Sequence, residues 1–325
     1  MRIVSGIQPT SQLHIGNYLG AIKQWIPLQE NNECVFFIAD LHAITTPYDP
    51  KNLQNAIKET VIAYISAGLN PEKAIIFVQS QIKEHTELGW LLNTICPIGE
   101  LERMTQYKDK SKKFKANINA GLLDYPVLQT ADVLLYKGQA VPVGKDQEQH
   151  IELMRTLSRK FNQKFGQTFS EPASMILKEG SKIMSLTDPK KKMSKSDDPK
   201  SCIFLFDEPE VITKKILSAQ TDSGKDVIYN VTKKPGISNL LTIYSLLTGK
   251  TTQQLEDEFR DKGYGDFKKS LALVVVNYLE PFRRKQKELA TREVYIQEIL
   301  KQGHSRALTI AQETIKEVKE KMGLV

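Results

Sequence analysis

Residues 190–198 read KKKMSKSDD, a stretch with four lysines and two serines. A lysine carries a compact positive charge on a flexible stem, and a serine hydroxyl donates hydrogen bonds. Side chains of these types at this spacing could hold the phosphate groups of a nucleotide. Lysine-rich stretches are also common as solvated surface. Other parts of the sequence are needed to distinguish a phosphate-binding stretch from a solvated one.

A second stretch of interest is QPTSQLHIGNYLGAIKQW, residues 8–25. Its tail predicts a helix, because apolar residues recur at helical spacing at Ile15, Leu19, Ile22 and Ile26. Gly16 would let a ligand approach the backbone closely, and Thr10, His14 and Asn17 lie near the positive end of the helix dipole. The stretch indicates an anion or nucleotide site, against the alternative of an ordinary loop with a packing glycine. The chain has neither GxGxxG nor GxxxxGK[ST], which excludes a dinucleotide fingerprint and a P-loop.

The elements that would position these stretches alternate between strand and helix. RIVSGI, ECVFFIAD (33–40) and KAIIFVQS (73–80) are apolar runs typical of strands in a parallel sheet. Between the last two lies a helical pattern with Asp49 as its cap and Pro50 at its first position. AVPVG (140–144) predicts another strand before a helix. Ligands bind beyond the carboxyl ends of such strands, which is where the stretch after Ile7 lies.

The second part of the chain has a different pattern. Strand signals fade after about residue 200, and helical patterns dominate. We therefore predict an α/β fold, with a Rossmann-like parallel-sheet domain at residues 1–205 and a smaller all-helical domain at 206–291. The last helix, 292–325, is predicted to pack back on the first domain through an apolar stripe formed by Ala307, Ala311, Ile315, Val318 and Met322.

Composition limits the class of protein. The chain has 325 residues, of which 40% are hydrophobic, and its net charge is +7. This length suits two domains, and the basic balance is compatible with a polyanionic partner. The three cysteines are far apart and suggest neither a disulfide framework nor a metal site. No apolar run predicts a membrane span or a secretion signal, so we expect a cytoplasmic protein.

The two stretches together resemble the signature motifs of class I aminoacyl-tRNA synthetases, HIGH and KMSKS. His14 matches the first histidine of HIGH, and Asn17 stands where the second would be. Asn at that place is similar to bacterial-type tryptophanyl-tRNA synthetases, in the subgroup of the tryptophan and tyrosine enzymes. Further similar blocks are GELERMTQYKDKS (99–111), YPVLQTADVLLY (125–136), VPVGKDQEQHIEL (141–153), IMSLTDPKKKMSKSD (183–197) and KPGISNLL (234–241).

The resemblance implies ATP-dependent activation of L-tryptophan to tryptophanyl-adenylate and transfer to tRNA(Trp). It implies ATP with Mg²⁺ carried by the nucleotide, and a homodimer without membrane contact. The Rossmann-like domain would be catalytic, and the helical domain would reach the anticodon. The alternatives are a tyrosyl-tRNA synthetase, a small-molecule nucleotidyltransferase with a related site, and a non-catalytic tRNA-binding protein.

The resemblance also implies residue roles around ATP. Lys192, Lys195, His14 and Thr10 would be catalytic, with the two lysines following the phosphates. For His14 the alternative is a helix-start histidine that bonds locally. The implied ATP-binding residues are Gln8, Pro9, Thr10, Gly16, Asn17, Gly144, Lys145, Asp146, Ile183, Lys192, Met193, Ser194, Lys195 and Ser196.

Asp132 is the candidate for reading the amino acid. It lies in an apolar stretch, where a carboxylate is costly unless paired, and indole offers one donor, its ring N–H. A buried acceptor for that donor can reject phenylalanine by about 10⁴–10⁵. The alternative is a helix-capping or surface aspartate. The other implied pocket residues are Tyr125, Gln129, Val141, Val143 and Gln147, and similarity places His42 near the same site.

Gln129 and Val4 depart from the family pattern, and one basic stretch has two interpretations. Gln129 stands where family members often have Met, and Val4 is smaller than the residue expected there. The basic stretch RMTQYKDKSKKFK (103–115) could be a mobile loop that reaches ATP or the tRNA acceptor end, or a solvated loop.

Overall fold

The computed structural model describes residues 1–9, 13–113, 118–144, 147–176, 183–194 and 198–325. Its sheet has the strand order β3-β2-β1-β4-β5, and neighbouring strands are parallel. The strands are β1 (Arg2–Ile7), β2 (Glu33–Ile38), β3 (Ala74–Val78), β4 (Ala140–Val143) and β5 (Ala173–Ile176). The predicted α/β fold with a Rossmann-like parallel sheet is confirmed.

Strands β2 and β3 are buried on both faces, which explains their continuous apolar runs, whereas β1 is partly buried and β5 has exposed and half-buried residues. Successive side chains of a strand point to opposite faces, and neighbours in β1 and β2 accordingly enter different core clusters. Ile3 and Cys34 belong to one cluster, and Val4 and Val35 to the other. The first cluster continues from the sheet into the helices of the second part of the chain, with Phe267 among its buried residues.

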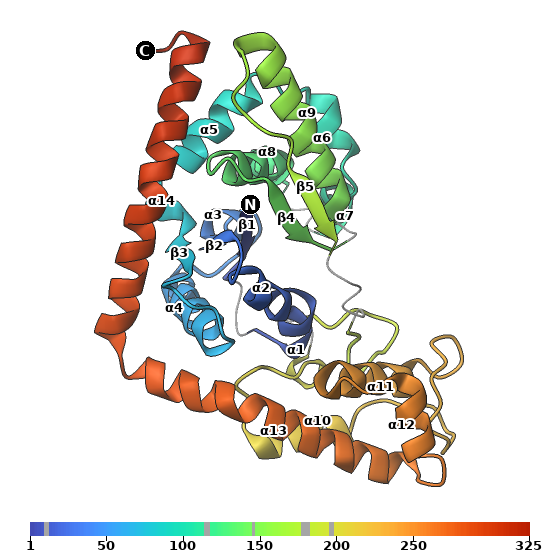
Figure 1. Ribbon diagram of the computed structural model, residues 1–325. Coiled ribbons are helices and arrows are strands. Elements are labelled where there is room, and N and C mark those ends of the chain that lie inside the picture. Colours follow the sequence, from blue (N-terminus) through green and yellow to red (C-terminus); the bar gives the residue numbers. More distant parts are fainter. Residues whose placement is uncertain (10–12, 114–117, 145–146, 177–182, 195–197) are drawn as a thin grey trace.

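Helices cover both faces of the sheet and form the lower part of the molecule in Figure 1. In the first part they are α1 (Ile15–Asn17), α2 (Lys23–Leu28), α3 (Asp40–Ala43), α4 (Pro50–Ser66), α5 (Glu84–Asn93), α6 (Ile98–Arg103), α7 (Thr105–Lys113), α8 (Ala120–Leu134) and α9 (Glu148–Phe165). In the second they are α10 (Pro209–Leu217), α11 (Pro235–Thr248), α12 (Thr252–Glu258), α13 (Tyr264–Ala290) and α14 (Glu293–Met322). Short 3₁₀ turns lie at Gln79–Gln81 and Pro199–Ser201.

The helix predicted between β2 and β3 begins and ends as its sequence indicates. Asp49 caps α4 by accepting a hydrogen bond from the Lys51 N–H, and Pro50 occupies the first helical position. The chain leaves the helix through Gly68 at a φ of 112°, a conformation that favours glycine. The strand, helix and strand therefore form the predicted parallel unit.

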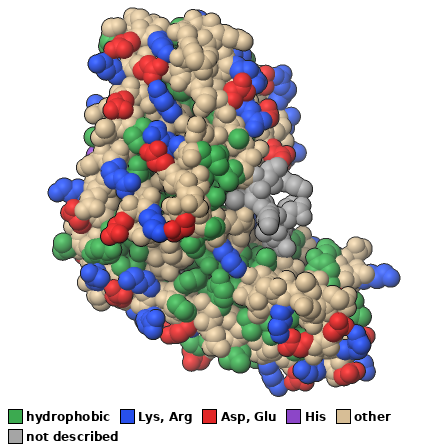
Figure 2. All heavy atoms as spheres, in the orientation of Figure 1, with side chains coloured by type: hydrophobic (Ala, Val, Ile, Leu, Met, Phe, Trp, Pro, Cys, Tyr) green, Lys and Arg blue, Asp and Glu red, His purple; other side chains and the backbone are tan. Residues whose placement is uncertain are grey.

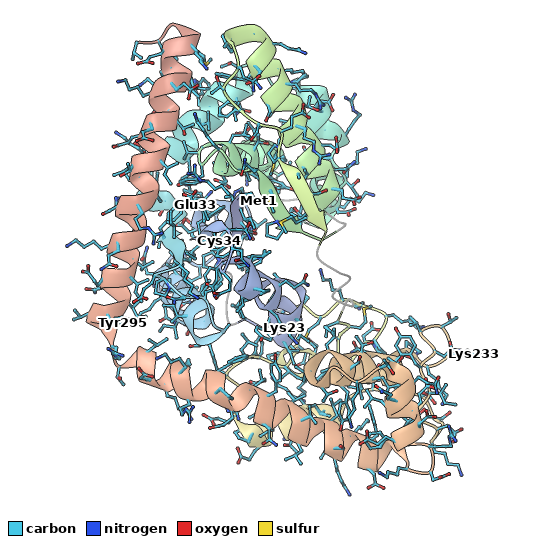
Figure 3. The ribbon with its side chains drawn as sticks, viewed as in Figure 1. Met1, Lys23, Glu33, Cys34, Lys233 and Tyr295 are labelled. Atoms are coloured by element: carbon cyan, nitrogen blue, oxygen red, sulfur yellow. The ribbon has the colours of Figure 1, made fainter. Side chains whose placement is uncertain are left out.

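The helix predicted after β1 is interrupted by a π-helical segment, Tyr18–Ile22, between α1 and α2. Tyr18 in this segment packs against α13, where its hydroxyl lies 3.0 Å from that of Tyr278 and its ring meets Phe282 edge-on. Lys23, labelled in Figure 3, donates to the Leu246 carbonyl oxygen at 2.7 Å. These contacts join the region of the HIGN motif to α11 and α13.

Residues 206–325, all of which the structure describes, form helices and no strand. Helix α13 packs against α4, α10 and α11. Helix α14 runs back along the edge strand β3 and α5. At Gly303 the approach is so close that a Cβ would lie 1.8 Å from the Ile76 carbonyl oxygen. Helix α14 thereby covers a sheet edge that would otherwise present unpaired backbone groups. The boundary at residues 205 and 206 stays a prediction.

Acidic and basic side chains are interspersed on the face of the molecule in Figure 2. The excess of positive charge is therefore not gathered into a single patch on this face. Among the described residues, no helix is long and apolar enough to cross a membrane.

Candidate functional site

A cavity of about 370 Å³ opens at the carboxyl ends of β1 and β4. These two strands are neighbours at the place where the strand order reverses, which is the usual ligand position in an open parallel sheet. Predicted residues that line this cavity are Gln8, Tyr125, Gln129, Asp132, Val141, Val143, Gly144 and Gln147. Five of these side chains come from helix α8 or strand β4, so residues far apart in sequence meet here.

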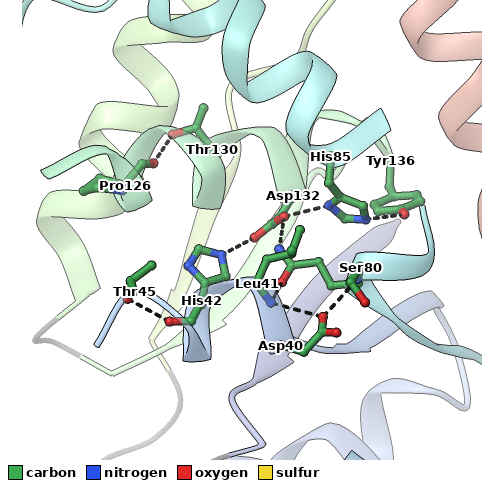
Figure 4. A network of polar contacts seen from close by, with 11 residues as sticks. Asp40, Leu41, His42, Thr45, Ser80, His85, Pro126, Thr130, Asp132 and Tyr136 are labelled. Atoms are coloured by element: carbon green, nitrogen blue, oxygen red, sulfur yellow. Dashed lines mark hydrogen bonds and ion pairs between the residues drawn. The ribbon is translucent and has the colours of Figure 1, made fainter. Parts of the chain in front are cut away.

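Asp132 lies in the wall of this cavity and is 1% exposed. One carboxylate oxygen accepts hydrogen bonds from Gln79 Nε2 at 2.6 Å and from His85 Nδ1 at 2.7 Å. The other accepts from His42 Nε2 at 2.6 Å. Figure 4 shows His42 and His85 converging on Asp132, from α3 and α5 respectively. Gln79 comes from the 3₁₀ turn after β3. This burial is incompatible with the alternative of a surface or capping aspartate.

The donors determine the charge of this carboxyl. Burial would raise the pKa of Asp132, but the nearby His42 and His85 lower it to about 2. An ionised carboxylate only accepts hydrogen bonds, so His42 Nε2 and His85 Nδ1 carry the hydrogens. The Tyr136 hydroxyl lies 2.8 Å from the other ring nitrogen of His85 and donates to it when that ring is neutral. Asp132 is therefore an anion in the cavity wall at neutral pH.

Tyr125, Lys110 and His150 form another part of the lining. Lys110 Nζ lies 4.1 Å from the centre of the Tyr125 ring, a cation–π arrangement. The Tyr125 hydroxyl lies 3.2 Å from His150 Nε2. Burial raises the pKa of Tyr125 to about 12 and lowers that of Lys110. Lys110 belongs to α7, so the expectation of a loop at residues 103–115 is wrong for Thr105–Lys113.

The HIGN segment is held by local bonds and by the segment that follows KMSKS. His14 Nδ1 accepts from the Asn17 N–H, and Asn17 Oδ1 accepts from the His14 N–H, both at 3.2 Å. This is the local bonding that was the alternative for His14, and it leaves Nε2 as the protonated nitrogen of a neutral ring. Backbone bonds join Ile15 N–H to the Ile203 oxygen and Leu205 N–H to the Leu13 oxygen. The two signature regions are thus adjacent.

Residues 183–193 form a two-stranded ribbon, named here the 183–193 ribbon. Met193 N–H donates to the Ile183 oxygen, and Ser185 N–H donates to the Lys191 oxygen, both at 2.9 Å. Ile183 also lies beside the HIGN segment, because a Cβ placed on Gly16 would lie 3.5 Å from the Cβ of Ile183. The same Cβ would be 2.9 Å from the His14 ring. The absence of a side chain at Gly16 therefore lets these groups meet.

The remaining predicted residues fall into two groups. Pro9 and Met193 are buried, whereas Lys192 is exposed on the ribbon beside Ser194. Thr10, Lys145, Asp146, Lys195 and Ser196 lie outside the described residues. The structure describes no group of three or more His, Cys, Asp or Glu side chains that could hold a metal ion.

Sequence reasoning missed Gln79, His85, Lys110 and His150, all of which contact predicted pocket residues. Gln79 follows the last residue of β3, and the rule that ligands bind beyond strand ends could have found it. Lys110 lies in the basic stretch 103–115, whose several lysines carry no signal that distinguishes one of them. His85 has no such signal, because a lone histidine in a helix does not reveal its partner.

Comparisons with known proteins agree with this geometry. The family described as tRNA synthetases class I (W and Y) matches residues 1–280. A tryptophan–tRNA ligase of Caldanaerobacter subterraneus subsp. tengcongensis is 50% identical over 325 residues, which cover 100% of this chain and 98% of that protein.

Two solved structures are also similar. The tryptophanyl-tRNA synthetase of Mycoplasma pneumoniae has a TM-score of 0.90 and 36% identity, and the match covers 100% of this chain and 98% of that one. The enzyme of Campylobacter jejuni, complexed with ADP and tryptophan, has a TM-score of 0.86 and 36% identity, with 100% of both chains covered.

Proposed function

Because the chain belongs to the class I tRNA synthetase family of the tryptophan and tyrosine enzymes, we propose that it is a tryptophan–tRNA ligase. It activates L-tryptophan with ATP to tryptophanyl-adenylate and transfers the tryptophanyl group to tRNA(Trp). The full-length likeness to a tryptophan–tRNA ligase at 50% identity favours tryptophan over the alternative of tyrosine.

The observation that favours a donor-bearing side chain such as tryptophan over phenylalanine is the ionised Asp132 in the cavity wall, whereas the choice over tyrosine, whose hydroxyl is also a donor, rests on the likeness given above. A carboxylate has about four lone-pair positions, and three side chains among the described residues donate to it. One position is left for a ligand donor, on the oxygen that His42 approaches. The indole ring N–H is such a donor, and the apolar side chains of Val141 and Val143 suit the ring itself.

The first step requires little covalent chemistry from the protein. The tryptophan carboxylate attacks the α-phosphorus of ATP, the bond from that phosphorus to the bridging oxygen breaks, and pyrophosphate leaves. Catalysis then consists of positioning the two substrates and stabilising the charge on the leaving group. We assign the stabilisation to Lys192 and Lys195, together with Mg²⁺ that arrives with the nucleotide.

The ATP site that we propose combines the two signature regions. Gln8, Pro9, Thr10, His14, Gly16 and Asn17 contribute from the first, and Ile183, Lys192, Met193, Ser194, Lys195 and Ser196 from the second. Gly144, Lys145 and Asp146 follow β4 and are assigned to the ribose. The adjacency of Leu13–Ile15 and Ile203–Leu205 supports this combination, because it brings the ends of both regions together.

The amino-acid pocket that we propose is the cavity beside them. It is formed by Tyr125, Gln129, Asp132, Val141, Val143 and Gln147, all of which line the same hollow. We add His42 and Lys110 to this set, because they contact Asp132 and Tyr125 respectively.

The domain roles follow from the same proposal. Residues 1–205 form the catalytic domain, with the helix at 292–325 packed on it, and residues 206–291 form the domain that reaches the anticodon. The helical content of the second region and the packing of α14 on β3 support this division. We propose that the enzyme acts in the cytoplasm.

We further propose a homodimer, since closed two-fold pairs are the commonest homo-oligomers and the block GELERMTQY resembles the interface region of this subgroup. Light scattering at micromolar concentration should give about twice the mass of one chain, 36.8 kDa. A fully active monomer would contradict this proposal.

The experiment that tests the function is ATP–pyrophosphate exchange with each of the twenty amino acids. We expect exchange that depends on tryptophan and far less on tyrosine or phenylalanine. Charging of tRNA(Trp) tests the second step. Exchange with tyrosine at least as fast as with tryptophan would overturn the assignment, and exchange without any amino acid would indicate a different nucleotidyltransferase.

A further inference from the structure

We propose that Asn239 is a positioning residue for ATP, which holds the 183–193 ribbon through a pair of hydrogen bonds from helix α11. Asn239 belongs to the KPGISNLL block and is 5% exposed. Its Oδ1 accepts from the Met184 N–H at 2.8 Å, and its Nδ2 donates to the Met184 carbonyl oxygen at 2.9 Å. The proposal rests on the assignment of the ribbon to ATP in the proposed function.

The geometry of the ribbon explains why Met184 needs this partner. Alternate residues of a strand direct their backbone groups to opposite edges. Ile183 and Ser185 bond to the second arm of the ribbon, whereas Met184 directs its N–H and C=O to the outer edge. The Asn239 carboxamide meets both groups there, in the place of a third strand. Because a two-stranded ribbon alone is marginally stable in water, this partner matters for its position.

The arms of the ribbon carry two of the proposed ATP residues. Ile183 directly precedes Met184, and Lys192 lies opposite Met184 on the other arm. A displacement of Met184 would therefore move Ile183, which we assign to the ATP site, and Lys192, which we assign to the leaving phosphates. The hydrogen bonds of the Asn239 side chain go to Met184 and not to Ile183 or Lys192, so it acts through the ribbon.

Helix α11 is a rigid support for this contact. Its start is pressed against the chain at Gln220, where a Cβ on Gly236 would lie 2.2 Å from the Gln220 carbonyl oxygen. Gln220 N–H in turn donates to the Leu186 oxygen at 2.7 Å, on the same arm of the ribbon as Met184. The ribbon is thus bonded to α11 directly and joined to it again through Gln220.

A matched control exists in Asn162, which makes the same kind of bonds elsewhere. Its Oδ1 accepts from the Thr168 and Phe169 N–H groups, and its Nδ2 donates to the Phe169 oxygen at 2.7 Å. This loop follows α9, and its hydrogen bonds among the described residues reach no proposed ATP residue. Asn162→Ala therefore measures the stability cost of losing such bonds without the positioning effect.

The test compares Asn239→Ala, Asn239→Asp and Asn162→Ala by calorimetric ATP binding, tryptophan-dependent exchange and thermal melting. We expect both Asn239 variants to weaken ATP binding by about tenfold, since each loses or opposes the hydrogen bonds that hold the ribbon, while the KM for tryptophan changes less than about twofold. Asn239→Asp is nearly isosteric but places an oxygen opposite the Met184 carbonyl. If it binds ATP like the wild type, a hydrogen-bonding role is refuted.

Two further measurements distinguish a positioning role of Asn239 from a purely structural role. If Asn239→Ala affects ATP binding no more than Asn162→Ala does, Asn239 is only structural. We expect Asn239→Ala and Lys192→Ala to be less than additive in exchange, because both act through one ribbon, and full additivity would overturn the inference. ATP binding is measured without an amino acid, so a wild type that exchanges with another amino acid contradicts only the proposed function.

Discussion

Asp132→Asn is the substitution that most directly tests how the cavity reads tryptophan. The amide can keep its oxygen toward Gln79 and His85, and turn its NH₂ group toward His42, whose ring can accept after a change of tautomer. The fold should therefore persist. The indole N–H, however, would meet an NH₂ group in place of a carboxylate oxygen.

The magnitude follows from the bond that is lost. A hydrogen bond to a charged group contributes about 1.5–3 kcal/mol, and each 1.4 kcal/mol corresponds to about a factor of ten. We therefore expect kcat/KM for tryptophan in ATP–pyrophosphate exchange to fall by roughly 10- to 100-fold. The ratio of tryptophan to phenylalanine should fall by the same factor, and the KM for ATP should hardly change. 1-Methyltryptophan, which lacks the donor, should lose much less.

Asp124→Asn is the matched control on the same helix. Asp124 accepts a hydrogen bond from Asn93 Nδ2 at 2.9 Å and is partly buried, but it does not line the cavity. We expect the amino-acid selectivity of the Asp124→Asn protein to equal that of the wild type. Thermal melts verify that both variants are folded at the assay temperature. A folded Asp132→Asn protein with unchanged preference for tryptophan would refute the reading of indole by this carboxylate. Asp132→Ala is a poorer test, because it leaves three buried donors unpaired.

Three more predictions follow from the structure. Because the pKa of Asp132 is lowered in the folded state, its ionisation stabilises the fold above the ordinary carboxyl pKa of 3.8, and this contribution is lost as the pH falls toward 2. In urea titrations over that pH window, the free energy of unfolding of the wild type should fall by about 2 kcal/mol relative to that of Asp132→Asn. Lys192→Ala should slow exchange by roughly 10²-fold with little change in tryptophan affinity. Lys191→Ala is the control and should stay near wild type, because the Lys191 ammonium pairs with a surface aspartate at 3.3 Å. Equal effects of the two substitutions would favour a solvated charge run. Gly303→Ala should destabilise the protein by about 1–3 kcal/mol or more in urea, because its Cβ would meet the backbone of β3. Gly265→Ala, with open space around its Cβ, should be neutral or stabilising by up to about 1 kcal/mol, and a neutral Gly303→Ala would contradict the close packing of α14.

The sequence predicted β2 and β3 well, because both are buried on both faces and therefore read as unbroken apolar runs. The short edge strand β5, Ala173–Ile176, was not predicted, because it has no such run. The start of α4 was equally clear, since Asp49 and Pro50 are local signals that act within one turn. The π-helical segment at Tyr18–Ile22 was not predicted. It occurs where Tyr18 has to meet α13, a contact between residues 260 positions apart, and no local pattern reports such a contact.

The candidate site shows the same division between local and distant information. Asp132 was found because a carboxylate in an apolar run needs a partner, and this requirement is visible in the sequence. Two of its three partners were not found, because Gln79 and His85 come from other elements and nothing local to them indicates a carboxylate. Lys110 was obscured differently, as one of several lysines in a stretch that was predicted to be a loop.

The partners of Asp132 also change how much selectivity this residue can supply. A site whose only polar group is left unpaired by the wrong substrate can discriminate by about 10⁴–10⁵. Asp132 keeps three donors when no ligand is bound, so phenylalanine would leave one lone-pair position empty and would not strand a bare charge. The indole N–H should then account for only the 10- to 100-fold factor expected above. The remaining preference for tryptophan has to come from shape, because a smaller ring leaves part of the pocket between Tyr125 and Val143 unfilled. It follows that Asp132→Asn should still prefer tryptophan over phenylalanine, and a complete loss of preference would mean that the carboxylate, rather than the apolar wall, sets the whole selectivity.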